Sequence, residues 1–154
     1  MRGPEQVAGF MRERGVSGEI ITLSPSAAKT SASAAQAVGC DVAQIAKSIV
    51  LKGEQGLYIF ILSGDKRVDL AKASAIVGEK LSLAKPDEVL ARLGYPVGGV
   101  PPFGHAEQVR TFVDKSVLRF EEVFASGGSE DTLLRIRVSE LLRAVGGVVA
   151  EASR

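Results

Sequence analysis

Lys47 and Ser48 are polar side chains in a setting that suggests chemistry. They begin the run of residues 47–52, whose apolar members would otherwise be expected in the core. A lysine at the start of a strand can reach into a cleft and bind a phosphate or an ester carbonyl through its ammonium group. The alternative is an edge lysine whose aliphatic stem packs on the protein while the ammonium reaches water.

Residues 95–105, Tyr-Pro-Val-Gly-Gly-Val-Pro-Pro-Phe-Gly-His, are a second candidate for chemistry. Three Pro and three Gly in eleven residues exclude a helix or a regular strand and predict a rigid loop. In such a loop we expect the backbone N–H groups of Gly98 and Gly99 to be bare, which suits binding of a carbonyl oxygen or an oxyanion. The alternative is a turn with a purely structural role.

Side chains for nucleophilic or metal chemistry are scarce. His105 is the only histidine and Cys40 the only cysteine, so neither an intrachain disulfide nor a Cys/His zinc cluster can form. We therefore expect no metal and no cofactor. His105 is either a base or a hydrogen-bonded loop residue, and Cys40, which has no basic neighbour to favour the thiolate, is interpreted as structural. Phosphate-loop, dinucleotide, zinc-protease and serine-hydrolase motifs are absent.

Charge limits how an RNA partner could be held. With 19 Lys and Arg against 18 Asp and Glu, the net charge is +1, so there is no general attraction to nucleic acid or to an anionic membrane. An RNA would need a local patch. Lys66 and Arg67, in the turn of residues 64–69, are the candidates, with a solvated turn that ends in a helix cap at Asp69 as the alternative.

Helices and strands alternate along the remainder of the chain. Capped or Gly-terminated patterns predict helices at residues 4–14, 31–38, 69–77, 85–94 and 139–145. Strands are predicted at residues 19–23, 47–52, 57–62, 111–113, 119–125 and 132–138. Residues 47–52 and 57–62 should form a hairpin at the centre of the core. Because the two strands of a hairpin are antiparallel, this pattern argues against an all-parallel sheet. The pattern indicates one mixed α/β domain over residues 1–154.

Membrane and export signals are not visible in the sequence. No apolar run approaches the roughly 18 residues that a membrane-spanning helix needs, and the first residues lack the apolar centre of a signal peptide. We expect a soluble, cytoplasmic protein without a membrane partner.

Several segments, taken in order, resemble the YbaK/ProX family, stand-alone relatives of the editing domain inserted in bacterial prolyl-tRNA synthetases. These segments are the Ala-rich helix of residues 31–38 and residues 44–50, 64–70, 98–105 and 126–128. The resemblance spans about residues 27–145. It implies a single α/β domain with a mixed, mostly antiparallel, curved and barrel-like sheet surrounded by helices.

The resemblance also implies a hydrolase that deacylates mischarged aminoacyl-tRNA in trans, on tRNA(Pro) or a similar tRNA carrying a small amino acid such as Ala or Cys. Lys47 matches the lysine that helps to place the tRNA 3′ end, and residues 98–102 match the GxxxP loop whose N–H groups contact the aminoacyl carbonyl. The implied catalytic residues are Lys47, Gly98, Gly99, Val100 and Pro102. The implied substrate-binding residues are Thr30, Ser48, Phe103, His105, Ser126, Gly127 and Gly128, and Lys66 and Arg67 are assigned to tRNA binding.

The implied partner is the 3′ acceptor end of an aminoacyl-tRNA, with an aminoacyl-tRNA synthetase as a second candidate partner and a monomer or homodimer as the acting form. Some family members carry an acidic residue in the strand after the Gly-Gly turn, where this chain has Leu133. An aminoacyl ester is already activated, so water, positioned by backbone and substrate groups, can attack it without a protein nucleophile. The competing reading is a non-catalytic module that binds the tRNA acceptor end in the same cleft, and a small-molecule hydrolase of another kind is third.

Overall fold

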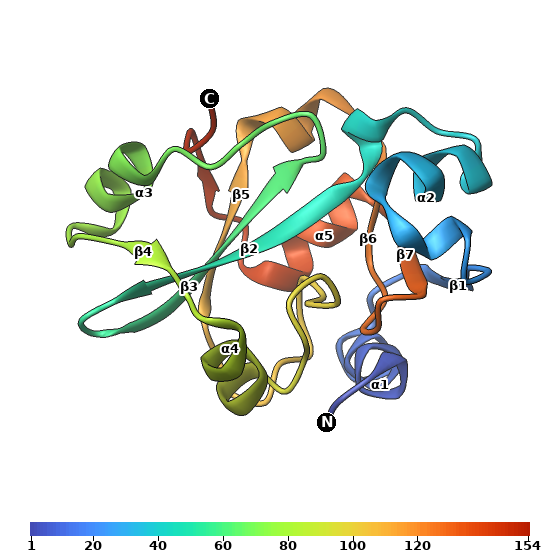
Figure 1. Cartoon of the computed structure of the whole chain (residues 1–154), viewed down its shortest axis with the longest axis horizontal. Helices are drawn as coiled ribbons and strands as arrows, with labels where there is room; N and C mark the ends of the chain where they lie inside the picture. Colours follow the sequence, from blue (N-terminus) through green and yellow to red (C-terminus); the bar gives the residue numbers. More distant parts are fainter.

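The computed structural model, which describes residues 1–154, contains five α-helices, three 3-10 helices and eight strands (Figure 1). In chain order they are α1 (Pro4–Arg14), β1 (Glu19–Thr22), η1 (Ala27–Lys29), α2 (Ser31–Val38), η2 (Val42–Gln44), β2 (Ala46–Gly53), β3 (Gly56–Ser63), α3 (Leu70–Val77), β4 (Ser82–Leu83), α4 (Pro86–Leu93), β5 (Arg110–Asp114), η3 (Lys115–Arg119), β6 (Glu122–Ser126), β7 (Thr132–Arg137), α5 (Val138–Val145) and β8 (Val149–Ala150). All five predicted helices are present. No helix combines the length and the apolar character that a bilayer crossing requires.

The strands divide between two sheets. The smaller one has the order β1-β7-β6 and is antiparallel throughout; the larger one has the order β4-β2-β3-β5-β8. Only the pairs β3–β5 and β5–β8 are parallel. A single parallel bridge between Ile45 and Phe124 links the two sheets. The prediction of one α/β domain with mixed, mostly antiparallel pairing is confirmed, with the strands shared between two sheets.

The β2–β3 hairpin forms the centre of the larger sheet. Its register pairs Ala46 with Ser63 and Gly53 with Gly56, so β3 ends beside the start of β2. Every residue of β3 after Gly56 is buried, as its uniformly apolar sequence predicts. The segment that follows Ser63 therefore begins next to the residues that start β2 (Figure 1).

Side chains of β2 alternate between two apolar clusters. Ala46 and Val50 belong to the cluster that contains Val100, whereas Leu51 belongs to a separate cluster. Since successive side chains of a strand point to opposite faces, Ser48 shares the face of Ala46, and Lys47 lies on the other face.

Local hydrogen bonds explain where the elements near the site begin. Thr30 caps α2 by accepting from Ser33 N, and Asp69 caps α3 by accepting from Lys72 N. Asp114 caps η3 in the same way, through Ser116 N. The predicted strand of residues 119–125 is therefore shifted: Arg119 still belongs to η3, and β6 begins at Glu122.

Candidate active site

A cavity of about 470 Å³ lies where the η1–α2 segment, the start of β2, the loop of residues 95–105 and the β6–β7 turn meet. Both faces of the start of β2 contribute, because four successive residues, 46–49, belong to the lining. The lining residues are Leu23, Ala28, Lys29, Thr30, Ser31, Ala34, Ile45, Ala46, Lys47, Ser48, Ile49, Val97, Gly98, Val100, Ser126, Ser129, Glu130, Thr132 and Leu133.

Six of the predicted site residues come together in this lining although they are far apart in the sequence. They are Thr30, Lys47, Ser48, Gly98, Val100 and Ser126. The others lie outside the lining: Gly99, Pro102, Phe103, His105, Gly127 and Gly128 stand behind or beside it, and Lys66 and Arg67 lie on a neighbouring turn.

Lys47 is a partly buried cation of the lining. Burial lowers the pKa of Lys47, the positive charge of Arg67 lowers it further, and the carboxylate of Asp65 opposes both effects. The ammonium group makes no ion pair within the protein. Lys47 is thus a partly desolvated charge that is available to an anionic or carbonyl group of a ligand.

The hydroxyl of Ser48 is the one buried side-chain nitrogen or oxygen in the chain that has no hydrogen-bond partner. A buried hydroxyl without a partner is unfavourable, and such groups are rare in native structures. Because Ser48 lines the cavity, the missing partner can come from a bound molecule.

The loop of residues 95–105 contributes Val97, Gly98 and Val100 to the cavity lining. A tight turn is closed by Gly99 N, which donates to Pro96 O at 2.9 Å, and Gly98 takes a φ of 91°. The N–H groups of Gly98 and Val100 donate to no acceptor in the protein. The expectation of a bare N–H therefore fits Gly98 and is corrected for Gly99, whose N–H is used within the turn.

Behind this turn, the remainder of the loop serves as its support. Phe103 is buried and stacks on Phe10, with ring centroids 4.6 Å apart. His105 Nε2 lies 2.7 Å from Pro101 O, and burial lowers the pKa of His105. These contacts commit the Phe103 side chain to α1 and the His105 side chain to the loop itself, and neither residue lines the cavity, where the resemblance implied a substrate contact. Pro102 is likewise buried.

The β6–β7 turn forms another side of the cavity. Ser126 Oγ accepts from Gly128 N at 3.1 Å, and a side chain at Gly127 would lie 2.8 Å from Thr132 Oγ1. Gly128 packs against the backbone of Gly3. The two predicted glycines thus shape the turn from behind, while Ser126 and Ser129 line the cavity.

Thirteen of the nineteen lining residues are not among the predicted site residues, and three of these change the character of the cavity. Lys29 and Glu130 add a positive and a negative charge, and Leu133 adds apolar surface. An acidic group is therefore present even though the strand position itself is Leu133. The only sequence signal for Glu130 was its place directly after the Ser-Gly-Gly-Ser turn, which does not show that the turn faces α2.

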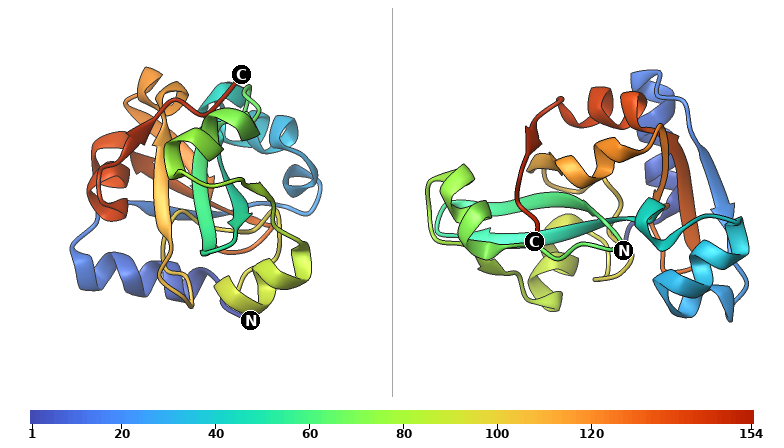
Figure 2. Two further views of the ribbon diagram at one scale, coloured as in Figure 1. Left: turned by 90° about the vertical axis from the view of Figure 1, so that its left-hand side faces the viewer. Right: turned by 90° about the horizontal axis from the view of Figure 1, so that it is seen from above.

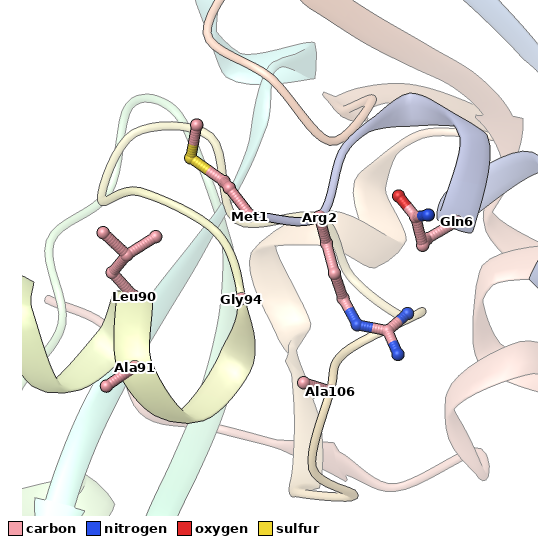
Figure 3. A pocket seen from close by; sticks show the side chains of 7 residues that line it. All are labelled: Met1, Arg2, Gln6, Leu90, Ala91, Gly94 and Ala106. Carbon is pink, nitrogen blue, oxygen red and sulfur yellow. The ribbon is translucent and has the colours of Figure 1, made fainter.

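A second cavity, of about 520 Å³, lies between the N-terminus and α4 (Figure 3). Figure 3 shows α4 with Leu90 and Ala91 on one side of the cavity and Met1, Arg2 and Gln6 on the other, with the guanidinium of Arg2 below Gln6. Arg2 N donates to Gly94 O at 2.8 Å, and Arg2 Nη1 to Gly104 O at 3.4 Å. None of the predicted site residues lines it, and its contact with the loop of residues 95–105 is made by Arg2 through Gly104.

The first cavity has the groups that an acyl ester requires. An ammonium group can bind a phosphate or a ribose oxygen, and bare N–H groups can stabilise the negative charge that develops on a carbonyl oxygen. The orphan hydroxyl of Ser48 adds a further donor or acceptor. Apolar residues such as Ala34, Ile45 and Leu133 leave room for a small side chain.

Comparisons of the sequence with known proteins point to one family. The sequence model of the aminoacyl-tRNA editing domain family matches residues 25–144. The uncharacterized protein YwhH of Bacillus subtilis (strain 168) is 36% identical over 109 residues, which is 70% of this chain and 69% of YwhH. The proline–tRNA ligase of Thermosipho africanus is 31% identical over 97 residues, 62% of this chain but 17% of the ligase.

Solved structures give the same result for the fold. A crystal structure of a proposed trans-editing enzyme for prolyl-tRNA synthetase is 40% identical, with a TM-score of 0.93, covering 98% of this chain and 96% of that one. The hypothetical protein APE2540 is 32% identical, with a TM-score of 0.89, covering 97% of this chain and 99% of that one.

Proposed function

The chain belongs to the aminoacyl-tRNA editing domain family, and from this premise we propose that it is a trans-editing hydrolase that deacylates mischarged aminoacyl-tRNA. The observation that carries the proposal is one cavity that joins Lys47, the unpaired Ser48 hydroxyl and the bare N–H groups of Gly98 and Val100. The proposed substrate is tRNA(Pro), or a similar tRNA, bearing a small amino acid such as Ala or Cys.

The proposed reaction is attack by water on the ester carbonyl. The water oxygen bonds to the carbonyl carbon, the carbonyl oxygen takes the negative charge of the tetrahedral intermediate, and the ester C–O bond to the ribose then breaks. A proton from the water ends on the ribose oxygen, which leaves free amino acid and uncharged tRNA. Neighbouring substrate hydroxyls can relay this proton, so no protein nucleophile is needed.

Each group in the cavity has one task in this reaction. The Lys47 ammonium holds the terminal adenosine, and the N–H groups of Gly98 and Val100 stabilise the oxyanion. Thr30 caps α2 and Ser126 orders the β6–β7 turn, so both fix the shape of the substrate-binding cavity. Gly99, Pro102, Phe103, His105, Gly127 and Gly128 act as positioning residues behind it.

The test is a deacylation assay on Ala-, Cys- and Ser-tRNA(Pro) with the wild type, Lys47→Ala and Lys80→Ala. Lys80 is an exposed lysine outside the cavity, so its variant controls for loss of a positive charge. We expect Lys47→Ala to lower kcat/KM by about 100-fold, since a charge-assisted contact is lost, and Lys80→Ala to leave it unchanged. Unchanged activity of Lys47→Ala on every substrate would remove Lys47 from the mechanism.

The same assay separates hydrolysis from binding. If the wild type binds mischarged tRNAs but hydrolyses none of them, the chain is a non-catalytic acceptor-end binding module. The proposed substrate also places the protein in the cytoplasm, where an aminoacyl-tRNA synthetase is a second candidate partner. Size-exclusion chromatography with multi-angle light scattering distinguishes a monomer from a homodimer.

A further inference from the structure

A groove of about 390 Å³ lies outside the active-site cavity and is lined without any apolar residue. We name it the basic groove. Its lining residues are Lys66, Lys115, Ser116, Arg119, Glu151, Ser153 and Arg154. Four of these seven carry a cationic side chain and one an anionic side chain, in a protein whose net charge is only +1. The excess of positive charge is therefore local.

Three segments far apart in the sequence build the basic groove. They are η3, the turn of residues 64–69 and the residues after β8, which lie together on the side of the molecule where Figure 1 shows the C-terminus. Asp114, which is fully buried, accepts from Ser116 Oγ at 2.5 Å, Ala152 N at 2.8 Å and Ser153 Oγ at 2.8 Å. One carboxylate thus fixes η3 to the last residues.

The turn is attached to the same assembly. Arg67 and Arg154 exchange two backbone hydrogen bonds, of 3.3 and 2.9 Å. Arg119 holds Asp65 through two bonds of 2.7 and 3.2 Å. The basic groove is therefore rigid before any ligand arrives, which reduces the entropy cost of binding.

The basic groove lies next to the active-site cavity. Ser63, which precedes the turn, pairs with Ala46 of the cavity lining, and Ser63 N donates to Ser116 Oγ at 3.1 Å. Gly64 packs against the carbonyl oxygen of Ile45, another lining residue. The Arg67 charge also acts on Lys47. Cations therefore continue from the cavity across the turn to the basic groove.

We propose that the basic groove binds the phosphates of the tRNA acceptor end that follow the aminoacylated adenosine held in the cavity. The inference rests on the proposed function and extends it to the path of the tRNA. Two of the cationic side chains are paired with carboxylates of the protein. Lys115 Nζ lies 3.7 Å from Glu151 Oε2, and Arg119 forms an ion pair with Asp65. Lys66 and Arg67 have no acidic partner within the protein and are free for phosphate oxygens.

The test compares two double variants that remove the same charge. Lys66→Gln/Lys115→Gln changes the basic groove, and Lys80→Gln/Lys85→Gln changes two exposed lysines outside both sites. Lys80 adjoins Glu79, which contacts Gly53 at the opposite end of the β2–β3 hairpin. Binding of uncharged tRNA(Pro) is measured by fluorescence anisotropy between 50 and 200 mM salt, together with hydrolysis of Ala-tRNA(Pro) and of the alanyl ester of adenosine.

We expect the groove variant to bind tRNA(Pro) about tenfold more weakly, with a salt dependence reduced by about one phosphate contact per lost lysine. It should hydrolyse the adenosine ester as the wild type does, because this ester has no phosphates, which are the groups that the groove is proposed to bind. The control variant should resemble the wild type in all three measurements.

Equal loss of tRNA binding in both variants, or no loss in the groove variant, would overturn the groove assignment while hydrolysis by the wild type still supports the proposed function. A wild type that hydrolyses neither ester contradicts the proposed function, and a groove-specific loss of tRNA binding then still supports the groove. Loss of adenosine-ester hydrolysis in the groove variant overturns the assignment, because the two sites would not be separable.

Discussion

Ser48 is a residue at which function and stability can be separated. Its hydroxyl has no partner in the free protein, so Ser48→Ala removes a group whose burial is unfavourable. We expect the free energy of unfolding to stay the same or to rise by up to about 1 kcal/mol, while kcat/KM for deacylation falls about tenfold. Urea denaturation and the deacylation assay measure the two quantities.

Ser63→Ala is the matched control for this prediction. The Ser63 hydroxyl is also buried but donates to Ala43 O, so its removal should lower the free energy of unfolding by about 1–2 kcal/mol. If Ser48→Ala destabilises the protein as Ser63→Ala does and leaves deacylation intact, Ser48 has no role toward the substrate. Ser48→Thr, which keeps the hydroxyl, should recover part of the activity.

The charge on Lys47 gives a prediction for pH. Burial lowers the pKa of Lys47 most, and the positive charge of Arg67 lowers it further. The ammonium group therefore loses its proton at a lower pH than in an ordinary lysine. Arg67→Gln removes a positive neighbour, so the pKa of Lys47 should rise, and the alkaline fall in kcat/KM should move to higher pH. The profile is measured on the alanyl ester of adenosine, with the spontaneous hydrolysis subtracted, and Arg110→Gln is the control. An alkaline limb that stays in place would show that Lys47 does not act as a cation.

Individual residues also differ in how well the sequence predicts that they belong to the site. Lys47 and Gly98 were identified because a lysine on an apolar strand and a Pro- and Gly-rich loop are locally unusual. Glu130 and Lys29 were not, because exposed charges in turns and short helices are common, and only the folded chain shows that both residues line the same cavity. For His105 the sequence left two alternatives, a base or a hydrogen-bonded loop residue, and its contact with Pro101 O fits the second.

The conformation of the β6–β7 turn should depend on Gly128. Gly128 and Gly146 both have positive φ, of 109° and 94°, but only a side chain at Gly128 would meet another backbone, at 2.9 Å from the carbonyl carbon of Gly3. Gly146→Ala should lower the free energy of unfolding by about 1 kcal/mol, because it adds backbone strain only. Gly128→Ala should lower it by about 3 kcal/mol, because it adds a steric clash to the strain. Only Gly128→Ala should also lower deacylation, because its turn lines the cavity. Equal unfolding free energies for the two variants would contradict this packing.

The elements that the sequence predicts are those with a repeated pattern or a cap. α2 begins at the Thr30 cap and ends at Gly39, and β3 is a long apolar run. β4 and β8 have two residues each, which is too short for any periodicity, and they form because neighbouring strands offer free edges. η3 was missed because its cap, Asp114, is also the last residue of a strand.

The division into two sheets is likewise a property of tertiary structure. Each strand carries the pattern of buried and exposed side chains, but the pattern does not say which strands pair. The β1–β7 pairing joins residues more than a hundred positions apart, and the parallel β3–β5 pair forms across α3, β4 and α4 (Figure 2). The resemblance to a known family predicted a mixed, mostly antiparallel arrangement, which the hairpin alone could not establish.

For the molecule as a whole, the buried Asp114 joins segments that form the basic groove. Burial raises the pKa of Asp114, but hydrogen bonds from Ser116, Ala152 and Ser153 lower it by more, so the net shift is downward. A carboxyl group whose pKa is lower in the folded state stabilises the fold above its unfolded pKa of about 3.9, and this contribution is lost as the pH falls through the folded value.

Asp114→Asn should therefore destabilise the protein in a pH-dependent manner. An amide has one acceptor oxygen, so its NH2 group must face donors of the present network, and buried groups are left unpaired. We expect a loss of about 2–4 kcal/mol in the free energy of unfolding at pH 7. The difference should be smaller at pH 3, which lies below the unfolded pKa of about 3.9, because the stabilising contribution of the carboxylate has begun to fall there. Urea denaturation at the two pH values measures both, with Asp131→Asn, in an exposed turn, as the control. A difference that is the same at pH 7 and pH 3 would mean that shape, rather than the charge of Asp114, holds η3 against the last residues of the chain.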